Sequence, residues 1–242
     1  MKQAFVFVGG EICPERITER PEENAVTIAA DVGWKNAKRL GITPRILVGD
    51  FDSLGEPDVE EETEVLQVPA EKDDTDTQLA VDLAISRGAE HITIIGGLDG
   101  RLDHTLSNLA ILEDLDRRGI HALITDGRNR VRFLRNNSTL LPRSNFRYFS
   151  LIAADEKVKG VSIDGGKYPL KKAKLSRLFN SLDMRDFQTV GYNSYFHKLL
   201  LNIYPSINIF GCLGVNGSFS NVKSLGINPE FFNIFFRNFC EC

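Results

Sequence analysis

The chain has 242 residues, enough for one large domain or two smaller ones, and its hydrophobic content of 42% can fill a core. A net charge of −4, from 29 basic and 33 acidic residues, argues against a general nucleic-acid-binding protein. No apolar run approaches the ~18–20 residues that span a bilayer, and the apolar N-terminal run is typical of a strand rather than a secretory signal. The four cysteines form no convincing zinc or disulfide pattern, so we expect a cytoplasmic protein.

The first part of the chain alternates short apolar runs with segments of helical composition. The runs predict strands over residues 3–10, 26–31, 45–50, 64–70, 91–97 and 121–127. Helices are predicted over 34–42, over 76–87, and over a third segment that ends near Gly119. Strands separated by helices indicate a parallel sheet, so we predict a layered α/β domain over residues 1–128. Ligands of such sheets bind beyond the carboxyl ends of the strands.

Residues 129–242 have a different pattern, with short alternating segments, turn signals and no helical stripe. This pattern predicts a smaller antiparallel β domain. Its last 65 residues, 178–242, contain 10 of the 16 phenylalanines, 9 asparagines and 8 charged residues, but no alanine. Two explanations fit this composition: a genuine Phe-rich β domain, or a tail that is out of its reading frame or replaced after about Arg177.

Acidic residues follow three successive predicted strands. Asp31 ends the second strand, Asp50 and Asp52 follow the third, and the acidic segment 73–76 follows the fourth. Carboxylates gathered at one sheet edge repel one another unless a cation lies between them. Magnesium typically binds one or two carboxylates together with water and phosphate oxygens. The pattern therefore predicts a magnesium site at this edge, with Asp76 as a possible third ligand.

A glycine-rich segment, residues 96–104, joins the fifth predicted strand to the third predicted helix. Its glycines permit close approach of the backbone to a ligand, and Arg101 is suited to bind phosphate through two hydrogen bonds. Simpler explanations exist for each motif alone: Asp74 or Thr75 as a helix cap, Asx turns after the third strand, and a surface position for His104. Because acidic residues follow three successive strands, a shared binding site is favoured over these separate explanations.

Three sequence blocks resemble the signature blocks of the thiamine pyrophosphokinase family. They are VGDFDSLG (48–55), PAEKDDTDTQLA (69–80) and GGLDGRLDHTLSNL (96–109), and KGVSIDGGKYPLKKAKL (159–175) resembles the C-terminal β-sandwich segment of the family. The resemblance covers roughly residues 1–177. It implies an α/β nucleotide-binding domain, a thiamine-binding β-sandwich domain and a homodimer. It also implies the transfer of a pyrophosphoryl group from ATP to thiamine, giving AMP and thiamine diphosphate.

The resemblance extends to single residues. It implies that a Mg²⁺ cofactor is bound by Asp50, Asp52 and Asp76. The catalytic residues that it implies are these three together with Arg101 and Asp103. Nucleotide- or phosphate-binding positions are implied at Asp31, Ser53, Lys72, Thr75, Gly97, Arg101 and His104. The general base is expected to be Asp76 or Asp103.

The chain also departs from the family pattern. Val32 stands where a small residue is usual, and residues 176–187 replace the expected end of the sandwich segment. Two alternative functions are therefore kept. One is a different magnesium-dependent nucleotide phosphohydrolase, and the other is a non-catalytic nucleotide-binding protein or defective copy. ATP and thiamine are the expected partners, with no nucleic acid and no membrane.

Overall fold

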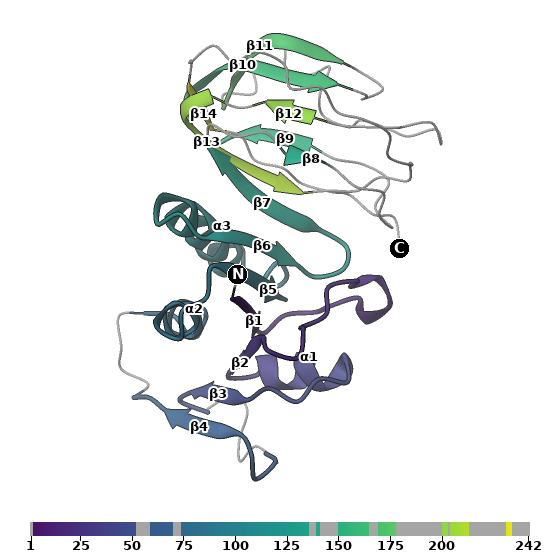
Figure 1. Cartoon of the computed structure of the whole chain (residues 1–242), viewed down its shortest axis with the longest axis vertical. Coiled ribbons are helices and arrows are strands. Elements are labelled where there is room, and N and C mark those ends of the chain that lie inside the picture. The colour runs from purple at the N-terminus through teal and green to yellow at the C-terminus, as the bar shows by residue number, and fades with distance from the viewer. Residues whose placement is uncertain are drawn as a thin grey trace. The chain divides into compact units, whose positions relative to one another are not determined.

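The computed structural model describes residues 2–51, 59–69, 74–135, 139–140, 150–164, 169–177, 200–202, 204–212 and 231–233. The chain divides into two compact units, residues 1–127 and residues 128–242 (Figure 1). Among the described residues, no helix combines the length and the hydropathy that a bilayer-spanning segment needs.

Unit 1 is built on a parallel sheet. Its strands are β1 (Gln3–Phe7), β2 (Val26–Ala30), β3 (Ile46–Gly49), β4 (Glu64–Gln67), β5 (His91–Ile95) and β6 (His121–Thr125). Their order across the sheet is β6-β5-β1-β2-β3-β4, and every neighbouring pair is parallel. The predicted α/β class with a parallel sheet is therefore confirmed. All six of these strands end at the same edge of the sheet, which we call the carboxyl edge.

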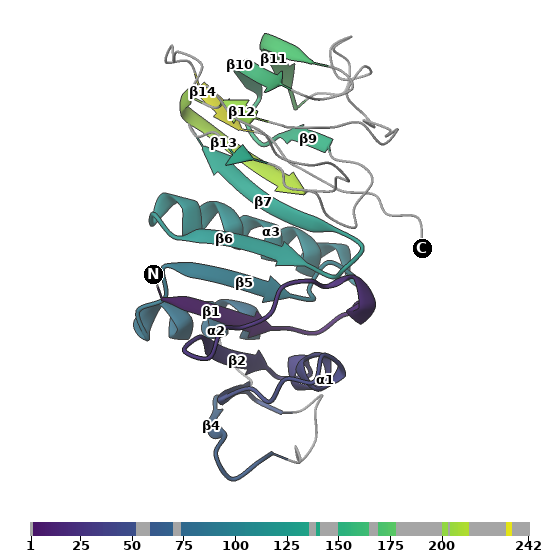
Figure 2. The ribbon, with the colours of Figure 1, turned by 45° about the vertical axis from the view of Figure 1, so that its right-hand side comes forward.

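Helices connect the strands and cover both faces of the sheet. They are α1 (Gly33–Arg39), α2 (Asp76–Ser86) and α3 (Leu102–Arg117), preceded by a short 3-10 turn, η1 (Pro14–Arg16). Helix α1 lies on one face, whereas α2 and α3 lie on the other, where Arg118 joins them by an ion pair with Asp82 (Figures 1 and 2). Each helix follows a strand directly or through a loop, so each begins at the carboxyl edge.

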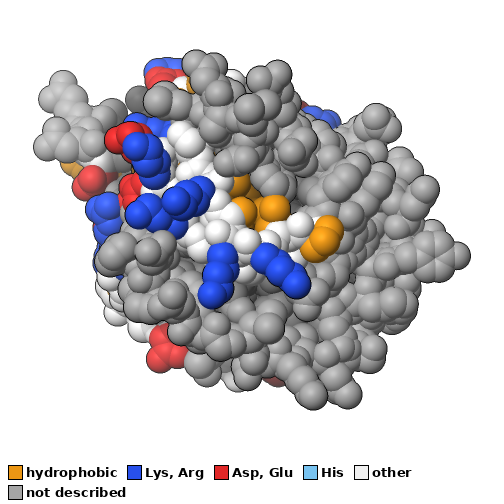
Figure 3. Space-filling model, turned by 90° about the horizontal axis from the view of Figure 1, so that it is seen from above, with side chains coloured by type: hydrophobic (Ala, Val, Ile, Leu, Met, Phe, Trp, Pro, Cys, Tyr) orange, Lys and Arg blue, Asp and Glu red, His pale blue; other side chains and the backbone are white. Residues whose placement is uncertain are grey.

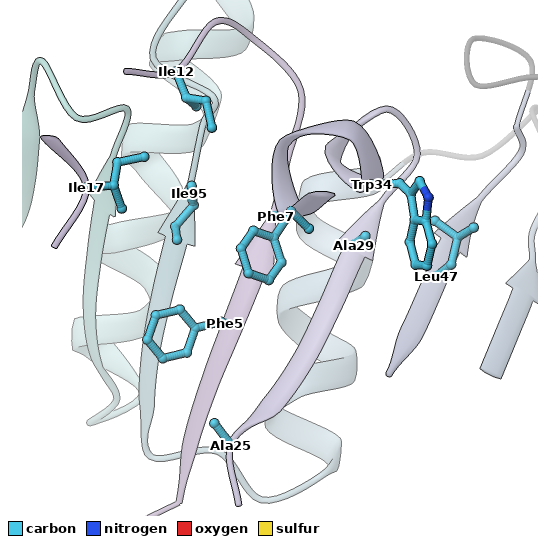
Figure 4. Close-up of a cluster of buried hydrophobic side chains, with 10 residues drawn as sticks. Phe5, Phe7, Ile12, Ile17, Ala25, Ala29, Trp34, Leu47 and Ile95 are labelled. Carbon is cyan, nitrogen blue, oxygen red and sulfur yellow. The ribbon is translucent and has the colours of Figure 1, made fainter. Parts of the chain in front are cut away.

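The core on the α1 side is built from alternate strand residues. Phe5 and Phe7 point to the same face of β1, where they join a cluster with Trp34 of α1 and Leu47 of β3 (Figure 4). All four side chains are buried, and complete burial of one such side chain contributes roughly 1.5–3 kcal/mol. Helix α1 approaches β1 closely, since a Cβ at Gly33 would lie 2.1 Å from the carbonyl oxygen of Phe7. Only glycine fits at this position.

The described residues of unit 2 form two sheets whose strands pair mainly antiparallel. The strands are β7 (Arg130–Arg135), β8 (Thr139–Leu140), β9 (Ser150–Ala153), β10 (Lys157–Asp164), β11 (Leu170–Ser176), β12 (Leu200–Asn202), β13 (Tyr204–Cys212) and β14 (Phe231–Asn233). One sheet has the order β11-β10-β12-β8, and in the other β13 pairs with β7, β9 and β14. The pair β13–β14 is parallel. The predicted smaller antiparallel β domain is confirmed in this form.

Lysines are frequent on the hairpin formed by β10 and β11. Exposed lysines occupy positions 157 and 159 on β10 and positions 171, 172 and 174 on β11. Lys and Arg side chains also gather on the face seen in Figure 3. Because β11 is the last of the described strands in its sheet, these charges discourage pairing with a strand of another chain.

Candidate functional site

The carboxyl edge of unit 1 brings Asp31 and the end of β3 together. Asp31 follows β2, and its N–H donates to the carbonyl oxygen of Val48 at 2.9 Å. A Cβ placed on Gly49 would lie 3.2 Å from the Cβ of Asp31. Asp50 directly follows Gly49, whose backbone is in close contact with Asp31.

Asp31 is held in an unusual backbone conformation. Its φ is +44°, in the left-handed region that few residues other than glycine adopt, and the residue is only 8% exposed. The carbonyl oxygen of Asp31 accepts a hydrogen bond from the N–H of Trp34 at 3.1 Å, which closes the turn into α1. Backbone strain of this kind concentrates at functional sites, and the nucleotide-binding role of Asp31 stays a prediction.

Val32, which replaces the usual small residue, packs over the end of β1. Its Cγ2 lies 2.8 Å from the position that a Cβ on Gly9 would occupy. The valine therefore fills the space above Gly9, and a side chain at position 9 would displace it. The turn after β2 and the turn after β1 are consequently in direct contact.

Asp50 directly follows β3 and is partly buried. Phe51, with φ +66°, packs against the hydrophobic cluster of Figure 4. Packing of Phe51 fixes the direction in which the chain leaves the sheet, immediately after Asp50. Asp52 and Ser53, two predicted site residues, lie outside the described residues.

The start of α2 presents a capped helix end. Thr75 is the N-cap, and its side chain accepts a hydrogen bond from the N–H of Gln78 at 3.2 Å. The capping explanation is thus confirmed for Thr75. Asp76 is the first residue of the helix and is partly buried, where a negative charge is favoured by the partial positive charge of the N-terminus. Lys72 lies outside the described residues.

The glycine turn after β5 is pressed against the end of β1. The N–H of Gly97 donates to the carbonyl oxygen of Gly9 at 2.8 Å, and the N–H of Gly96 donates to that of Thr125 at 2.9 Å. A Cβ on Gly96 would lie 2.5 Å from the carbonyl oxygen of Val8. Gly97 is therefore part of a tightly bonded turn on the same edge as Asp31 and Asp50.

Arg101 forms an ion pair with Asp103 that the sequence did not predict. Nε donates to Oδ1 at 3.1 Å and Nη2 to Oδ2 at 2.5 Å, and both side chains are largely exposed. The hydrogen bonds from Arg101 lower the pKa of Asp103, and the same pair raises the pKa of Arg101. His104 is the next residue of α3 and is exposed. Any phosphate bound by Arg101 would compete with Asp103 for the guanidinium.

The structure thus gathers Asp31, Asp50 and Gly97 along a continuous band of contacting turns. In the described part of the chain, no group of three Asp, Glu, His or Cys residues is arranged to hold a metal ion. Sequence reasoning missed two buried asparagines, Asn36 and Asn108, which donate hydrogen bonds to these turns. In the sequence, the only sign of these contacts is that each asparagine stands on the side of its helix whose other residues are apolar and face the sheet.

Comparisons with known proteins agree on one family. The family model described as "Thiamin pyrophosphokinase, catalytic domain" matches residues 19–124. The thiamine pyrophosphokinase of Bacillus subtilis is 31% identical over 183 residues, which cover 73% of this chain and 85% of that protein.

Solved structures agree with this assignment. The crystal structure of the Bacillus subtilis enzyme matches with a TM-score of 0.73 and 25% identity over 88% of this chain and 99% of that one. A thiamin pyrophosphokinase family protein from Enterococcus faecalis matches with a TM-score of 0.66 and 26% identity over 88% of this chain and 98% of that one. Sequence and structure together show that this chain belongs to the thiamine pyrophosphokinase family of enzymes.

Proposed function

We propose that the chain catalyses the magnesium-dependent transfer of a pyrophosphoryl group from ATP to the hydroxyl oxygen of thiamine. The products are thiamine diphosphate and AMP. The observation that carries this proposal is the meeting of Asp31, the end of β3 before Asp50 and the glycine turn at Gly97 on one sheet edge. Membership of the family supplies the reaction.

The donor chemistry of this edge fits magnesium. Asp50 and Asp76 are both partly buried carboxylates at element ends on the carboxyl edge, and both offer only oxygen. We propose these two residues and Asp52 as the magnesium ligands, Asp52 on the strength of the family resemblance. The bound ion would neutralise negative charge on the phosphate oxygens. Transfer of this kind needs little covalent chemistry from the protein, which instead positions the two substrates.

Arg101 is proposed to bind the phosphates of ATP. Its guanidinium is exposed and carries a charge at any physiological pH, and it can form two parallel hydrogen bonds to a phosphate. To do so it must leave Asp103. The ion pair is exposed to solvent and therefore weak, so a phosphate can replace Asp103. The other proposed nucleotide contacts are Asp31, Ser53, Lys72, Thr75, Gly97 and His104.

The general base is proposed to be Asp76 or Asp103. The ion pair with Arg101 lowers the pKa of Asp103, which makes this carboxylate a weaker proton acceptor until Arg101 leaves it to bind phosphate. Asp76 lies at the start of α2, on the same edge as Asp50. A carboxylate that binds magnesium is also a weaker proton acceptor, so the kcat of variants at the two positions decides which of them accepts the proton from the hydroxyl of thiamine.

Incubation of the protein with ATP, magnesium and thiamine tests the reaction. AMP and thiamine diphosphate are the expected products, and Asp50→Asn should abolish their formation while the thermal unfolding temperature stays unchanged. Asp114→Asn is the matched control. Asp114 is an exposed carboxylate paired with Arg118, and it lies near the C-terminus of α3, away from the carboxyl edge. Retained activity in Asp50→Asn would refute the metal role.

The same assay separates the alternatives. Nucleotide breakdown that does not need thiamine would indicate a phosphohydrolase, and ATP binding without transfer would indicate a non-catalytic copy. The second outcome is the one expected if residues 178–242 are out of frame, because part of the thiamine site would then be missing. A cytoplasmic homodimer also belongs to the proposal, and light scattering of the purified protein would measure the dimer.

A further inference from the structure

Two buried asparagines hold the turns at the carboxyl ends of β1 and β5. The Nδ2 of Asn36, in α1, donates to the carbonyl oxygens of Val8 and Gly10, each at 2.8 Å. The Nδ2 of Asn108, in α3, donates to the carbonyl oxygen of Gly97 at 2.9 Å. The asparagines are 5% and 6% exposed, respectively. Each amide therefore acts on backbone at the edge where the proposed site lies.

The two turns are also bonded to each other. The N–H of Gly97 donates to the carbonyl oxygen of Gly9 at 2.8 Å, and the N–H of Glu11 donates to Oδ2 of Asp99 at 3.3 Å. Helices α1 and α3 lie on opposite faces of the sheet (Figure 2). The amides thus secure one bonded pair of turns from both sides of the sheet.

Holding a carbonyl group also fixes the direction of the following N–H group. A peptide unit is planar and trans, so its carbonyl and its N–H point in opposite directions. The contact of Asn36 with Val8 aims the N–H of Gly9 away from that amide, and the contact of Asn108 with Gly97 does the same for the N–H of Leu98. In the described part of the chain, neither N–H donates to a backbone carbonyl. Backbone N–H groups fixed in direction are suited to phosphate oxygens.

We infer that Asn36 and Asn108 are positioning residues for ATP, because they hold the two turns in the conformation that receives its phosphates. This inference rests on the proposed function. Neither asparagine touches the substrate. A merely structural amide would contribute only to stability, whereas a positioning amide also determines the affinity for ATP.

Alanine variants at both asparagines test the inference in the full chain. Each is expected to raise the KM and the Kd for Mg-ATP by about tenfold, with the KM for thiamine unchanged. Amide hydrogen exchange of residues 96–99 should also accelerate in Asn108→Ala. Thr27→Val is the matched control, because buried Thr27 accepts a hydrogen bond from the N–H of Arg45 at 2.9 Å near the other end of β2. The control should lower the unfolding temperature without changing the Kd for Mg-ATP.

An unchanged Kd for Mg-ATP in both asparagine variants would overturn the inference, even if the wild type forms AMP. The inference would also be overturned if Thr27→Val weakened the binding of Mg-ATP as much as the asparagine variants do. Where an alanine variant does not fold, the serine variant, whose hydroxyl is shorter than the amide, provides the same comparison. If the wild type binds Mg-ATP without forming AMP, the proposed reaction fails, and the Kd values still decide the positioning role.

Discussion

Replacing Gly96 with alanine tests how tightly β5 and β1 meet at the carboxyl edge. The φ of Gly96 is +100°, and a Cβ there would lie 2.5 Å from the carbonyl oxygen of Val8 and 2.8 Å from that of Gly9. Both neighbours are backbone atoms, which cannot rotate away as a side chain can. To restore an ordinary contact of 3.4 Å, one of the two chains must move by about 0.9 Å.

The expected cost has two parts. Placing a side chain on a residue with left-handed φ costs roughly 1–2 kcal/mol, and forced displacement in a packed region costs typically about 1–3 kcal/mol more. The sum, about 2–5 kcal/mol, is a large share of the stability of a typical domain, about 5–15 kcal/mol. Gly119→Ala supplies the control, because Gly119 has φ +76° and nothing within 4 Å of its Cβ position. Only the first part of the cost applies there.

Urea unfolding of the full chain measures both variants, and the rate of AMP formation is recorded on the same samples. Gly96→Ala should unfold at a clearly lower urea concentration than Gly119→Ala. It should also lose AMP formation under conditions in which it is still folded, because the turn that carries Gly97 has moved. Equal urea midpoints for the two variants would show that the residues after β5 and β1 do not lie as close together as described.

Two further predictions concern charged residues. Asp103→Asn should lower the KM for ATP, since Arg101 is released for phosphate; an unchanged KM would contradict this competition, and a loss of about 100-fold or more in kcat would assign the general base to Asp103. Hydrogen bonds from Lys38 and then Thr43 lower the pKa of Glu60 below its ordinary value of 4.5. A lowered folded-state pKa stabilises the protein above the unfolded-state pKa, and this stability is lost as the pH falls through the folded-state value. Glu60→Gln should therefore lose less thermal stability than wild type on acidification; identical pH profiles would refute the contribution.

The framework of unit 1 could be predicted because its signals are local. Apolar runs predicted the strands, and helical segments between them predicted the parallel sheet. The cap at Thr75 followed from its place before an apolar stripe, and Gly119, with φ +76°, directly follows the residues that end α3. These features depend on residues a few positions apart, where periodicity and capping preferences are informative.

Long-range polar contacts could not be predicted in the same way. Asn36 and Asn108 lie in helices, and nothing in their neighbourhoods indicates that they bind carbonyl groups 28 and 11 residues away. The ion pair of Arg101 with Asp103 joins residues only two apart, yet a phosphate-binding arginine was equally consistent with the sequence. In α3, Leu106 is 55% exposed, because the buried side of the helix is formed by Leu109, Leu112 and Leu115.

The central place of β1 in the sheet has a consequence for synthesis of the protein. Gln3 pairs with His91 and Phe7 with Ile95, so one side of β1 finds its neighbour only after nearly a hundred residues have been translated. Until β5 leaves the ribosome, the edge of β1 that pairs with β5 presents unpaired backbone N–H and C=O groups. This edge of β1 can pair with a strand of another chain for as long as β5 is missing, so a delay in synthesis before residue 95 would favour aggregation.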